Sequence, residues 1–392
     1  MRGILNPYNR IFIPYLFISI LGILNIYSVS RSFGDYLFYR HITYFFLGLV
    51  VFIFLSRVKL PEWKEFSYIF FSISIFLLLF VLLKEKGIKR WLFIGNFSFQ
   101  VSDACKPLLI YFLSMVFSLN KKRGYIDSFK LLFLHILPFF LILIEPDLGS
   151  AFFYIFLFAF YLIFSSFNIK VKLFYIFAFL SLIFSLNFFA FFIFSSLLLL
   201  FIIIFSKFPM GDKILLTFSV LIPGLTVPFI YNNLLKEYQR KRIRHFLNPS
   251  EDPKGAGWQI LQGKLAIGSG GILGKGFLKG SHKSLAFLPQ AHSDFAFASF
   301  AEEFGFIGSS ILILLYFFLL SGILNILKEK EGFSYFFILG IFASIFYSFL
   351  VNIGGVIGFL PVTGIPLPFF SYGGTNFVIH SLLLGLTLSF IK

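Results

Sequence analysis

One aspartate, Asp294, stands where a polar stretch meets a long apolar run, so its carboxylate borders both water and lipid. There it is placed to take a proton from a hydroxyl nucleophile. His292, two residues earlier, either orients it or is only a residue of the loop. The alternative is that Asp294 only caps the helix expected to begin at residue 297, because Ser and Asp are common N-cap residues. The residue types alone leave both interpretations open.

A cluster of positive charges lies earlier in the same polar stretch, where Tyr238 is followed by Arg240, Lys241, Arg242 and Arg244. Crowding cations costs free energy unless an anion lies among them, and the Arg guanidinium matches phosphate oxygens with two parallel hydrogen bonds. The cluster therefore predicts a site for a phosphate-bearing ligand. A polybasic segment resting on anionic lipid headgroups is the alternative.

A glycine-rich run, GSGGILGKG, occupies residues 268–276. Ser269 and Gly276 break the Walker pattern, so the run predicts no nucleotide site. Its backbone amides, with Lys275 among them, can still approach an anion closely. A flexible turn is the alternative.

Ionisable residues also stand inside apolar runs long enough to cross a membrane. Glu302 and Glu303 lie near the start of one run, and Lys106 lies near the start of another. Charge at membrane depth is costly and by default indicates a functional site. Pairing of the glutamates with Lys106 is the alternative.

The sequence has no pattern typical of a transition-metal site. It contains no HExxH motif, no cysteine cluster and no clustered histidines, and the lone Cys105 permits no internal disulfide. We therefore expect no required cofactor and no dedicated metal ligands, while a divalent cation held by carboxylates stays open.

The composition indicates that the candidate site residues are positioned by segments that lie in a lipid bilayer. Of the 392 residues, 58% are hydrophobic and 13% are charged, against roughly 25% charged in soluble domains. A soluble enzyme, a disordered chain and a disulfide-framed secreted domain are therefore excluded. Apolar runs of about 20 residues predict membrane-spanning helices. They lie near residues 11–30, 42–56, 67–83, 104–119, 131–145, 149–166, 214–232, 297–326, 334–353 and 374–391.

A further apolar block, residues 173–205, is too long for one span even with generous tilt. A hairpin turning near Asn187 keeps Lys328 and Lys330 on the same side as the basic N-terminus, as the positive-inside rule requires. The sequence thus predicts an all-α polytopic membrane protein, a single domain over residues 1–392. It has about twelve spans and two cytoplasmic termini.

Residues 233–296 form the one long polar stretch, which this topology places outside the cytoplasm, so nucleic acid is not an expected partner. Trp258, Leu261 and Leu265 share one face of a predicted short helix, which either lies in the membrane interface or packs on the bundle. Because the stretch holds the basic cluster and ends beside Asp294, we expect it to carry the catalytic region.

Five segments carry distinctive wording: RWLFIGNFSFQVSDACKP (90–107), EPDLGSA (145–151), YQRKRIRHFLNPSEDPKGAGWQILQGKLAIGSGGILGKGF (238–277), LPQAHSDFAFASFAEEFGFIG (288–308) and LPVTGIPLPFFSYGG (360–374). In this order, and over nearly the whole chain, they resemble the SEDS family of peptidoglycan polymerases. GKGFLKG is more similar to the rod-shape (RodA) branch than to the division branch. Family members have ten spans, so the resemblance implies a SEDS-type bundle with the 173–205 hairpin inserted.

Four positions, Val101, Asp103, Gln290 and Ser293, depart from the family pattern. The family usually reads Gln-Pro-Ser-Glu where this chain has QVSD at 100–103, so the carboxylate of Asp103 is shortened but kept. Gln290 stands where the family has Glu, and Ser293 stands where it has Thr.

The resemblance implies a glycosyltransferase that polymerises lipid II, the undecaprenyl-pyrophosphate-linked disaccharide-pentapeptide, for cell-wall elongation and cell shape. Asp294 is then the expected base, and Trp91 matches a position implicated in family activity. Arginines of the basic cluster are expected to stabilise the leaving lipid pyrophosphate. The expected substrate-binding residues are Trp91, Lys106, Tyr238, Arg240, Arg242, Arg244, Lys275, His292, Glu302 and Glu303.

The partners that the resemblance implies are the nascent glycan strand, a class B penicillin-binding protein and other elongation-complex proteins of the bacterial plasma membrane. The rival function is a transporter that flips lipid II. The prolines of residues 360–374 and the charges at Lys106, Glu302 and Glu303 suit a transport path. Against it, the candidate substrate residues gather on one face, and the sequence shows no inverted repeat.

Overall fold

The computed structural model describes residues 6–58, 64–83, 90–94, 97–119, 124–145, 147–185, 187–205, 207–233, 237, 240, 256–281, 288 and 290–391. Its helices are α1 (Pro7–Phe33), α2 (Tyr36–Leu55), α3 (Lys64–Leu82), α4 (Val101–Leu119), α5 (Tyr125–Ile144), α6 (Leu148–Phe164), α7 (Ile169–Phe184), α8 (Phe188–Leu200), the π-helical η1 (Phe201–Phe205), α9 (Met210–Asn233), α11 (Ala256–Gly270), α13 (Ala296–Leu327), α14 (Gly332–Ile357) and α15 (Gly374–Ser389). Its strands are β1 (Trp91–Ile94) and β2 (Phe97–Gln100).

Eight helices of the described chain are long and apolar enough to cross a membrane, and shorter apolar helices stand among them. Lipid-exposed backbone must satisfy its own hydrogen bonds, which a helix does within one segment. The predicted all-α polytopic fold is confirmed, and the helices follow the apolar runs of the sequence.

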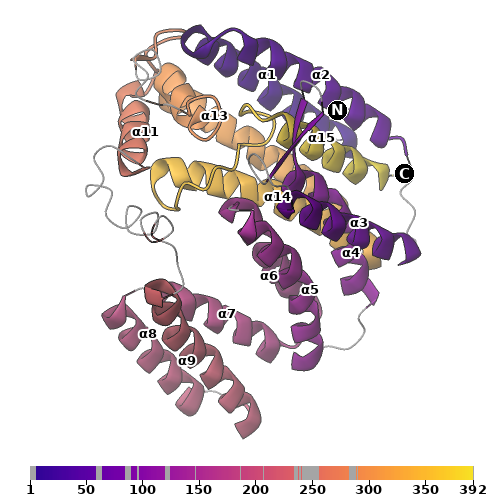
Figure 1. Cartoon of the computed structure of the whole chain (residues 1–392), viewed down its shortest axis with the longest axis vertical. Coiled ribbons are helices and arrows are strands. Elements are labelled where there is room, and N and C mark those ends of the chain that lie inside the picture. Colours follow the sequence, from indigo (N-terminus) through magenta and orange to yellow (C-terminus); the bar gives the residue numbers. More distant parts are fainter. Residues whose placement is uncertain are drawn as a thin grey trace.

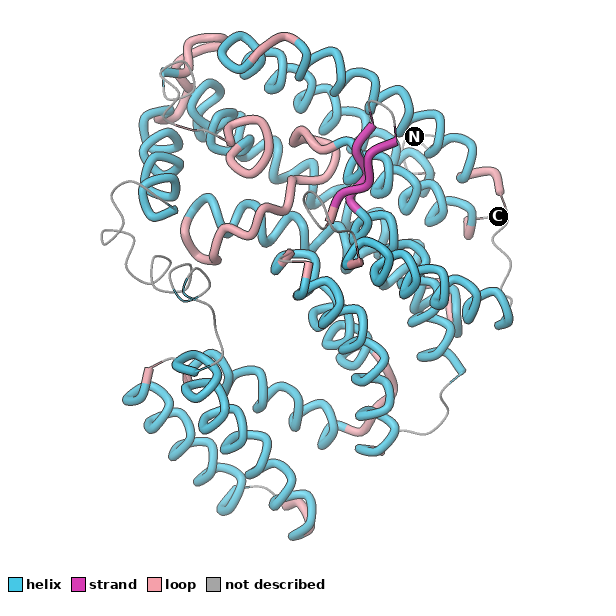
Figure 2. Tube along the Cα trace, viewed as in Figure 1, coloured by secondary structure: helices cyan, strands magenta, loops and turns pink. Residues whose placement is uncertain are grey.

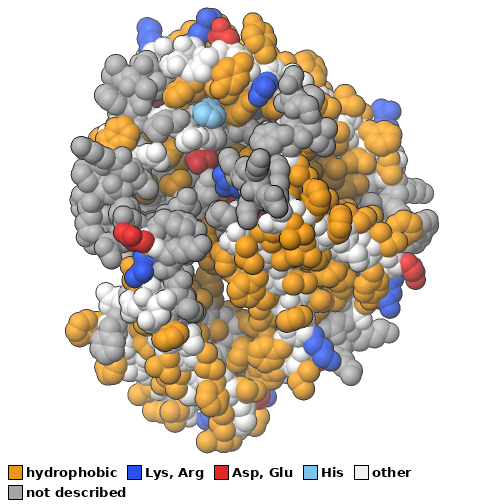
Figure 3. Space-filling model, viewed as in Figure 1, with side chains coloured by type: hydrophobic (Ala, Val, Ile, Leu, Met, Phe, Trp, Pro, Cys, Tyr) orange, Lys and Arg blue, Asp and Glu red, His pale blue; other side chains and the backbone are white. Residues whose placement is uncertain are grey.

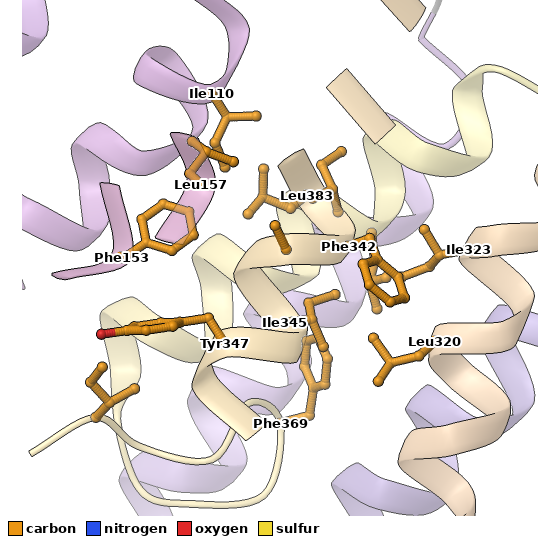
Figure 4. Close-up of a cluster of buried hydrophobic side chains, with 14 of the residues drawn as sticks. Ile110, Phe153, Leu157, Leu320, Ile323, Phe342, Ile345, Tyr347, Phe369 and Leu383 are labelled. Atoms are coloured by element: carbon orange, nitrogen blue, oxygen red, sulfur yellow. The ribbon is translucent and has the colours of Figure 1, made fainter. Parts of the chain in front are cut away.

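Helix α14 lies at the centre of the main bundle (Figure 1). It is apolar on all sides, which is typical of a helix buried all round. Figure 4 shows Phe342 and Ile345 of α14 between Phe153 of α6 on one side and Ile323 of α13 on the other. This packing fixes the helices whose ends carry the polar segments.

Helices α7, α8 and α9 form a separate group at the lower end of the view (Figure 1). The group has its own small core, made by Phe177, Ile202, Leu216 and Val220. Asn187 Oδ1 accepts a hydrogen bond from Ala190 N at 3.1 Å and so caps α8 after the turn that ends α7. The chain therefore turns back where the sequence predicts a hairpin.

The chain ends lie together at one end of the bundle. Pro7, Lys328 and Ile391 line one shallow recess, while Asp294 stands just before the opposite end of α13. The part of α13 that follows its break at Gly305, residues 306–327, alone spans about 33 Å at about 1.5 Å per residue. The termini and Asp294 are thus at opposite ends, and the side of the membrane that each faces stays a prediction.

Candidate active site

A cavity of about 470 Å³ opens at the end of the bundle opposite the chain termini. Figure 2 shows the β-hairpin beside several irregular segments in this region. In Figure 3, acidic, basic and histidine side chains come together in the upper central part of a face that is otherwise largely hydrophobic. The described residues that line the cavity are Tyr44, Arg90, Trp91, Ser98, Gln100, Asp103, Gln259, Ile260, Gln290, Ser293, Asp294, Phe295, Pro361, Val362, Thr363, Gly364, Pro366, Tyr372, Gly373, Gly374, Thr375 and Asn376.

The turn that carries Asp294 is held by hydrogen bonds from three directions. Phe295 N donates to Gln290 O at 3.1 Å within the turn, and Tyr372 N donates to His292 O at 2.8 Å. Asn352 of α14 donates to Asp294 O at 3.2 Å and to Ile365 O at 2.9 Å. The backbone of Asp294 is therefore fixed, and its side chain lines the cavity.

The capping interpretation of Asp294 is wrong in this structure. The N-cap of α13 is Phe295, and no side chain caps the helix there. Asp294 Oδ2 instead lies 3.8 Å from the position that a Cβ at Gly364 would occupy. The carboxylate thus faces the loop between α14 and α15.

Replacing Asn352 by Leu should lower activity about tenfold to hundredfold, because small displacements of a catalytic group are costly. The variant removes both hydrogen bonds from its amide and frees the Asp294 turn from α14. The loss should fall mainly on kcat, measured with the purified protein. The control, Asn325→Leu, changes a residue at the far end of α13 and should leave kcat unchanged. Equal kcat for both variants would contradict this role of Asn352.

Trp91, Ser98 and Gln100 of the β-hairpin also line the cavity. The part in activity that the resemblance implies for Trp91 stays a prediction. β2 is held to α15 by Gln100 N, which donates to Thr375 Oγ1 at 3.2 Å. Asp147 accepts hydrogen bonds from Gln100 Nε2 and from Ser102 Oγ. It also caps α6 by accepting a hydrogen bond from Ser150 N at 3.2 Å.

Lys106 pairs with Asp103 one helical turn away, at 2.6 Å. Both side chains are buried, and Asp103 lines the cavity. The alternative in which Lys106 pairs with the glutamates of α13 is therefore wrong. The i, i+3 spacing of Asp103 and Lys106 is the sequence feature that could have indicated the observed pair.

Glu302 and Glu303 lie where α13 is broken at Gly305, whose φ of 65° and ψ of −162° are not helical. Lys275 Nζ pairs with Glu302 Oε1 at 2.6 Å. Ser28 of α1 donates to Glu303 Oε1 at 2.8 Å. None of these four charged or polar residues is among the described residues that line the cavity.

The glycine-rich run forms backbone hydrogen bonds with α13 at the break in that helix. Lys275 N and Gly276 N donate to the carbonyl oxygens of Glu302 and Glu303 at 3.0 Å. In return, Phe306 N and Ile307 N donate to the carbonyls of residues 271 and 272 at 2.9 and 3.2 Å. The amides of Lys275 and Gly276 are therefore bonded to α13. The sequence pattern gave no indication that the glycine-rich run contacts this helix.

His292 contacts Tyr372, with ring centroids 5.7 Å apart, and also Phe33. Burial lowers the pKa of the His292 imidazole, so this ring is predominantly neutral at neutral pH. His292 is not among the described cavity-lining residues. Its backbone carbonyl accepts the hydrogen bond from Tyr372 N that holds the Asp294 turn.

Most of the basic cluster lies outside the described residues, including Tyr238, Arg242 and Arg244. Arg240 is described and does not line the cavity. Helix α11 follows, packed on α13 through Gly263, which faces Phe295, with Leu261 and Leu265 exposed. The helix thus packs on the bundle through a face other than the one predicted, while Leu261 and Leu265 of the predicted face are exposed.

The sequence interpretation missed the hairpin and its cavity residue Arg90. A pattern was present, because Gly95-Asn96 stands between two short aromatic and β-branched runs, as in many two-residue hairpins. Among the described residues, no three His, Cys, Asp or Glu side chains lie together as metal ligands would.

The fold and site define a multi-pass helical membrane protein with a polar cavity at one end and an aspartate in its wall. The model of the family described as Cell cycle protein, which comprises FtsW, RodA and SpoVE, matches residues 9–196 and 189–391. The chain belongs to this family, and the predicted SEDS resemblance is confirmed.

Similar proteins agree with this assignment. A probable peptidoglycan glycosyltransferase FtsW of Wigglesworthia glossinidia brevipalpis is 31% identical over 392 residues, covering 95% of this chain and 90% of the relative. The peptidoglycan glycosyltransferase RodA of Treponema pallidum is 28% identical, covering 99% and 98%. A structure described as "Structural coordination of polymerization and crosslinking by a peptidoglycan synthase complex" matches with a TM-score of 0.70 at 24% identity, covering 96% and 95%. That likeness shows the fold.

Proposed function

We infer that the chain is a peptidoglycan glycosyltransferase, as its relatives are named, and we propose that it polymerises lipid II. The observation that carries the proposal is the position of Asp294, whose side chain lines a 470 Å³ cavity and whose backbone is fixed by neighbouring segments. Cavities of a few hundred Å³ with few polar groups are typical of substrate sites.

Asp294 acts as the general base in this proposal. A sugar hydroxyl gives its proton to the Asp294 carboxylate while its oxygen forms a bond to the anomeric carbon of the second substrate. The bond from that carbon to the pyrophosphate oxygen breaks, and the lipid pyrophosphate leaves with the electron pair. Trp91 offers an aromatic face to the saccharide from the hairpin wall.

The finer assignments belong to the same proposal. The cavity end faces the outside of the plasma membrane, both termini are cytoplasmic, and Tyr238, Arg242 and Arg244 are proposed to bind the lipid-linked substrate. The partner is a class B penicillin-binding protein, supported by the complex to which the fold is similar. The biological role is elongation, although the relatives include both FtsW and RodA proteins.

An experiment in reconstituted vesicles distinguishes polymerisation of lipid II from its transport across the membrane. Purified protein is reconstituted into vesicles, and fluorescent lipid II is added to the outer leaflet only. We expect glycan polymer in vesicles in which the cavity end faces outward, without movement of lipid II to the inner leaflet. Transfer of lipid II between leaflets without polymer would contradict the proposal and support the transporter.

A further inference from the structure

We propose that Arg90 is the anion-binding residue of the cavity and receives the phosphate oxygens of the lipid-linked donor. This inference rests on the proposed function for the identity of the donor. It adds a residue that lies on the β-hairpin side of the cavity, immediately before β1, and far along the chain from the basic cluster.

The hydrogen bonding of Arg90 supports this assignment. Arg90 lines the cavity, and its Nε is buried with no hydrogen-bond partner among the described residues. A buried guanidinium N–H without a partner is costly, because it has lost water and gained nothing in return. An anion in the cavity would satisfy that donor.

Among the described residues that line the cavity, Arg90 is the cation that could bind such a ligand. Asp103 and Asp294 are the carboxylates on the described wall, and Asp103 is already paired with Lys106 at 2.6 Å. Asp294 belongs to the loop that precedes α13, whereas Arg90 belongs to the hairpin side. A base and a cation from different segments that line one cavity suit a reaction in which a proton leaves one substrate and a pyrophosphate leaves the other.

A buried carboxylic acid near Arg90 strengthens the argument. Glu145, just after α5, is 0% exposed, and neither of its carboxylate oxygens has a hydrogen-bond partner among the described residues. Burial, with a smaller contribution from Asp147, raises the pKa of Glu145 to about 8 although Arg90 opposes the shift. Glu145 is therefore predominantly neutral at pH 7 and leaves the charge of Arg90 for a ligand. The charged and titratable groups that face Glu145 are Arg90, Asp147, Cys105 and Tyr154.

The test is direct binding of inorganic pyrophosphate to the purified full chain in detergent, by titration calorimetry at pH 7. Arg90→Gln should weaken binding about 100-fold, and Arg90→Lys, which keeps the charge, should weaken it less. The control, Arg31→Gln, changes an exposed arginine that contacts Tyr27 and should bind as the unmodified protein does. Equal binding by the Arg90 variants, or no binding by the unmodified protein, would overturn the proposal.

A second variant, Glu145→Gln, tests how pyrophosphate binding depends on pH. Above about pH 8, ionised Glu145 should cancel part of the Arg90 charge, so pyrophosphate affinity should fall relative to Glu145→Gln, in which position 145 stays neutral. Pyrophosphate itself also titrates in this range, but this affects both proteins equally. The ratio of the affinity of the unmodified protein to that of Glu145→Gln therefore reports on Glu145 alone. A ratio that stays constant from pH 7 to pH 9 would contradict the part assigned to Glu145.

Polymerisation assays distinguish a failure of the Arg90 inference from a failure of the proposed function. If the unmodified chain polymerises lipid II and Arg90→Gln does so with unchanged KM and unchanged pyrophosphate inhibition, the Arg90 inference fails and the function stands. If pyrophosphate binding depends on Arg90 but no polymer forms, the anion site stands and the proposed function fails.

Discussion

Replacing Asp294 by Asn should reduce glycan polymerisation by at least about 100-fold, because a positioned general base contributes about 10² to 10⁴ in rate. Asparagine has nearly the same shape and cannot accept the hydroxyl proton. The backbone hydrogen bond from Asn352 to residue 294 does not involve the replaced side chain, so the turn should keep its conformation. The measurement is polymer formed per minute by purified protein from labelled lipid II, with substrate in excess.

The control for this variant is Ser293→Ala, which changes the neighbouring residue of the same turn. Ser293 Oγ donates to Gln290 Oε1 at 2.9 Å near the surface of the turn, so its loss should change the rate by less than about tenfold. Both variants should elute and unfold as the unmodified protein does. A fully active Asp294→Asn protein would remove Asp294 from the mechanism.

The second large effect is expected from Gly274→Ala in the glycine-rich run. Gly274 has φ of +83°, and a Cβ there would lie 2.1 Å from the carbonyl oxygen of Glu303. The substitution therefore forces the run away from the break in α13. Backbone strain and overlap together should lower the free energy of unfolding by about 3 kcal/mol. The unsatisfied backbone groups beside Gly305 would add to this loss.

Thermal unfolding in detergent, followed by tryptophan fluorescence, measures this effect. Gly268→Ala is the matched control, because Gly268 lies within α11 and a Cβ there would meet nothing within 4 Å. Alanine favours a helix over glycine by up to about 1 kcal/mol, so this variant should unfold at the same or a higher temperature. Matching Tm values for the two variants would show that the run does not support α13.

The helices could be predicted because the apolar runs that form them are continuous in sequence. The turn at Asn187 followed from length and charge alone, since no single span accommodates residues 173–205. Asp294 could be singled out as a candidate for a similar local reason, because it stands at the boundary between a polar stretch and a span.

The contacts that organise the site could not be read from such patterns. Lys275 meets Glu302 because α13 breaks at Gly305 and exposes backbone groups that another segment satisfies. Arg90 reaches the cavity through a hairpin whose short strands give a weak pattern beside long apolar helices. Both contacts depend on how segments far apart in the chain pack together.

The most direct test of the central claim is a stoichiometric assay with the purified full chain and lipid II in detergent, where no bilayer exists to be crossed. We expect one lipid pyrophosphate released for each disaccharide added to a glycan strand, with both products dependent on Asp294. Intact lipid II after incubation, with no strand and no released lipid pyrophosphate under conditions where the protein stays folded, would contradict the assignment.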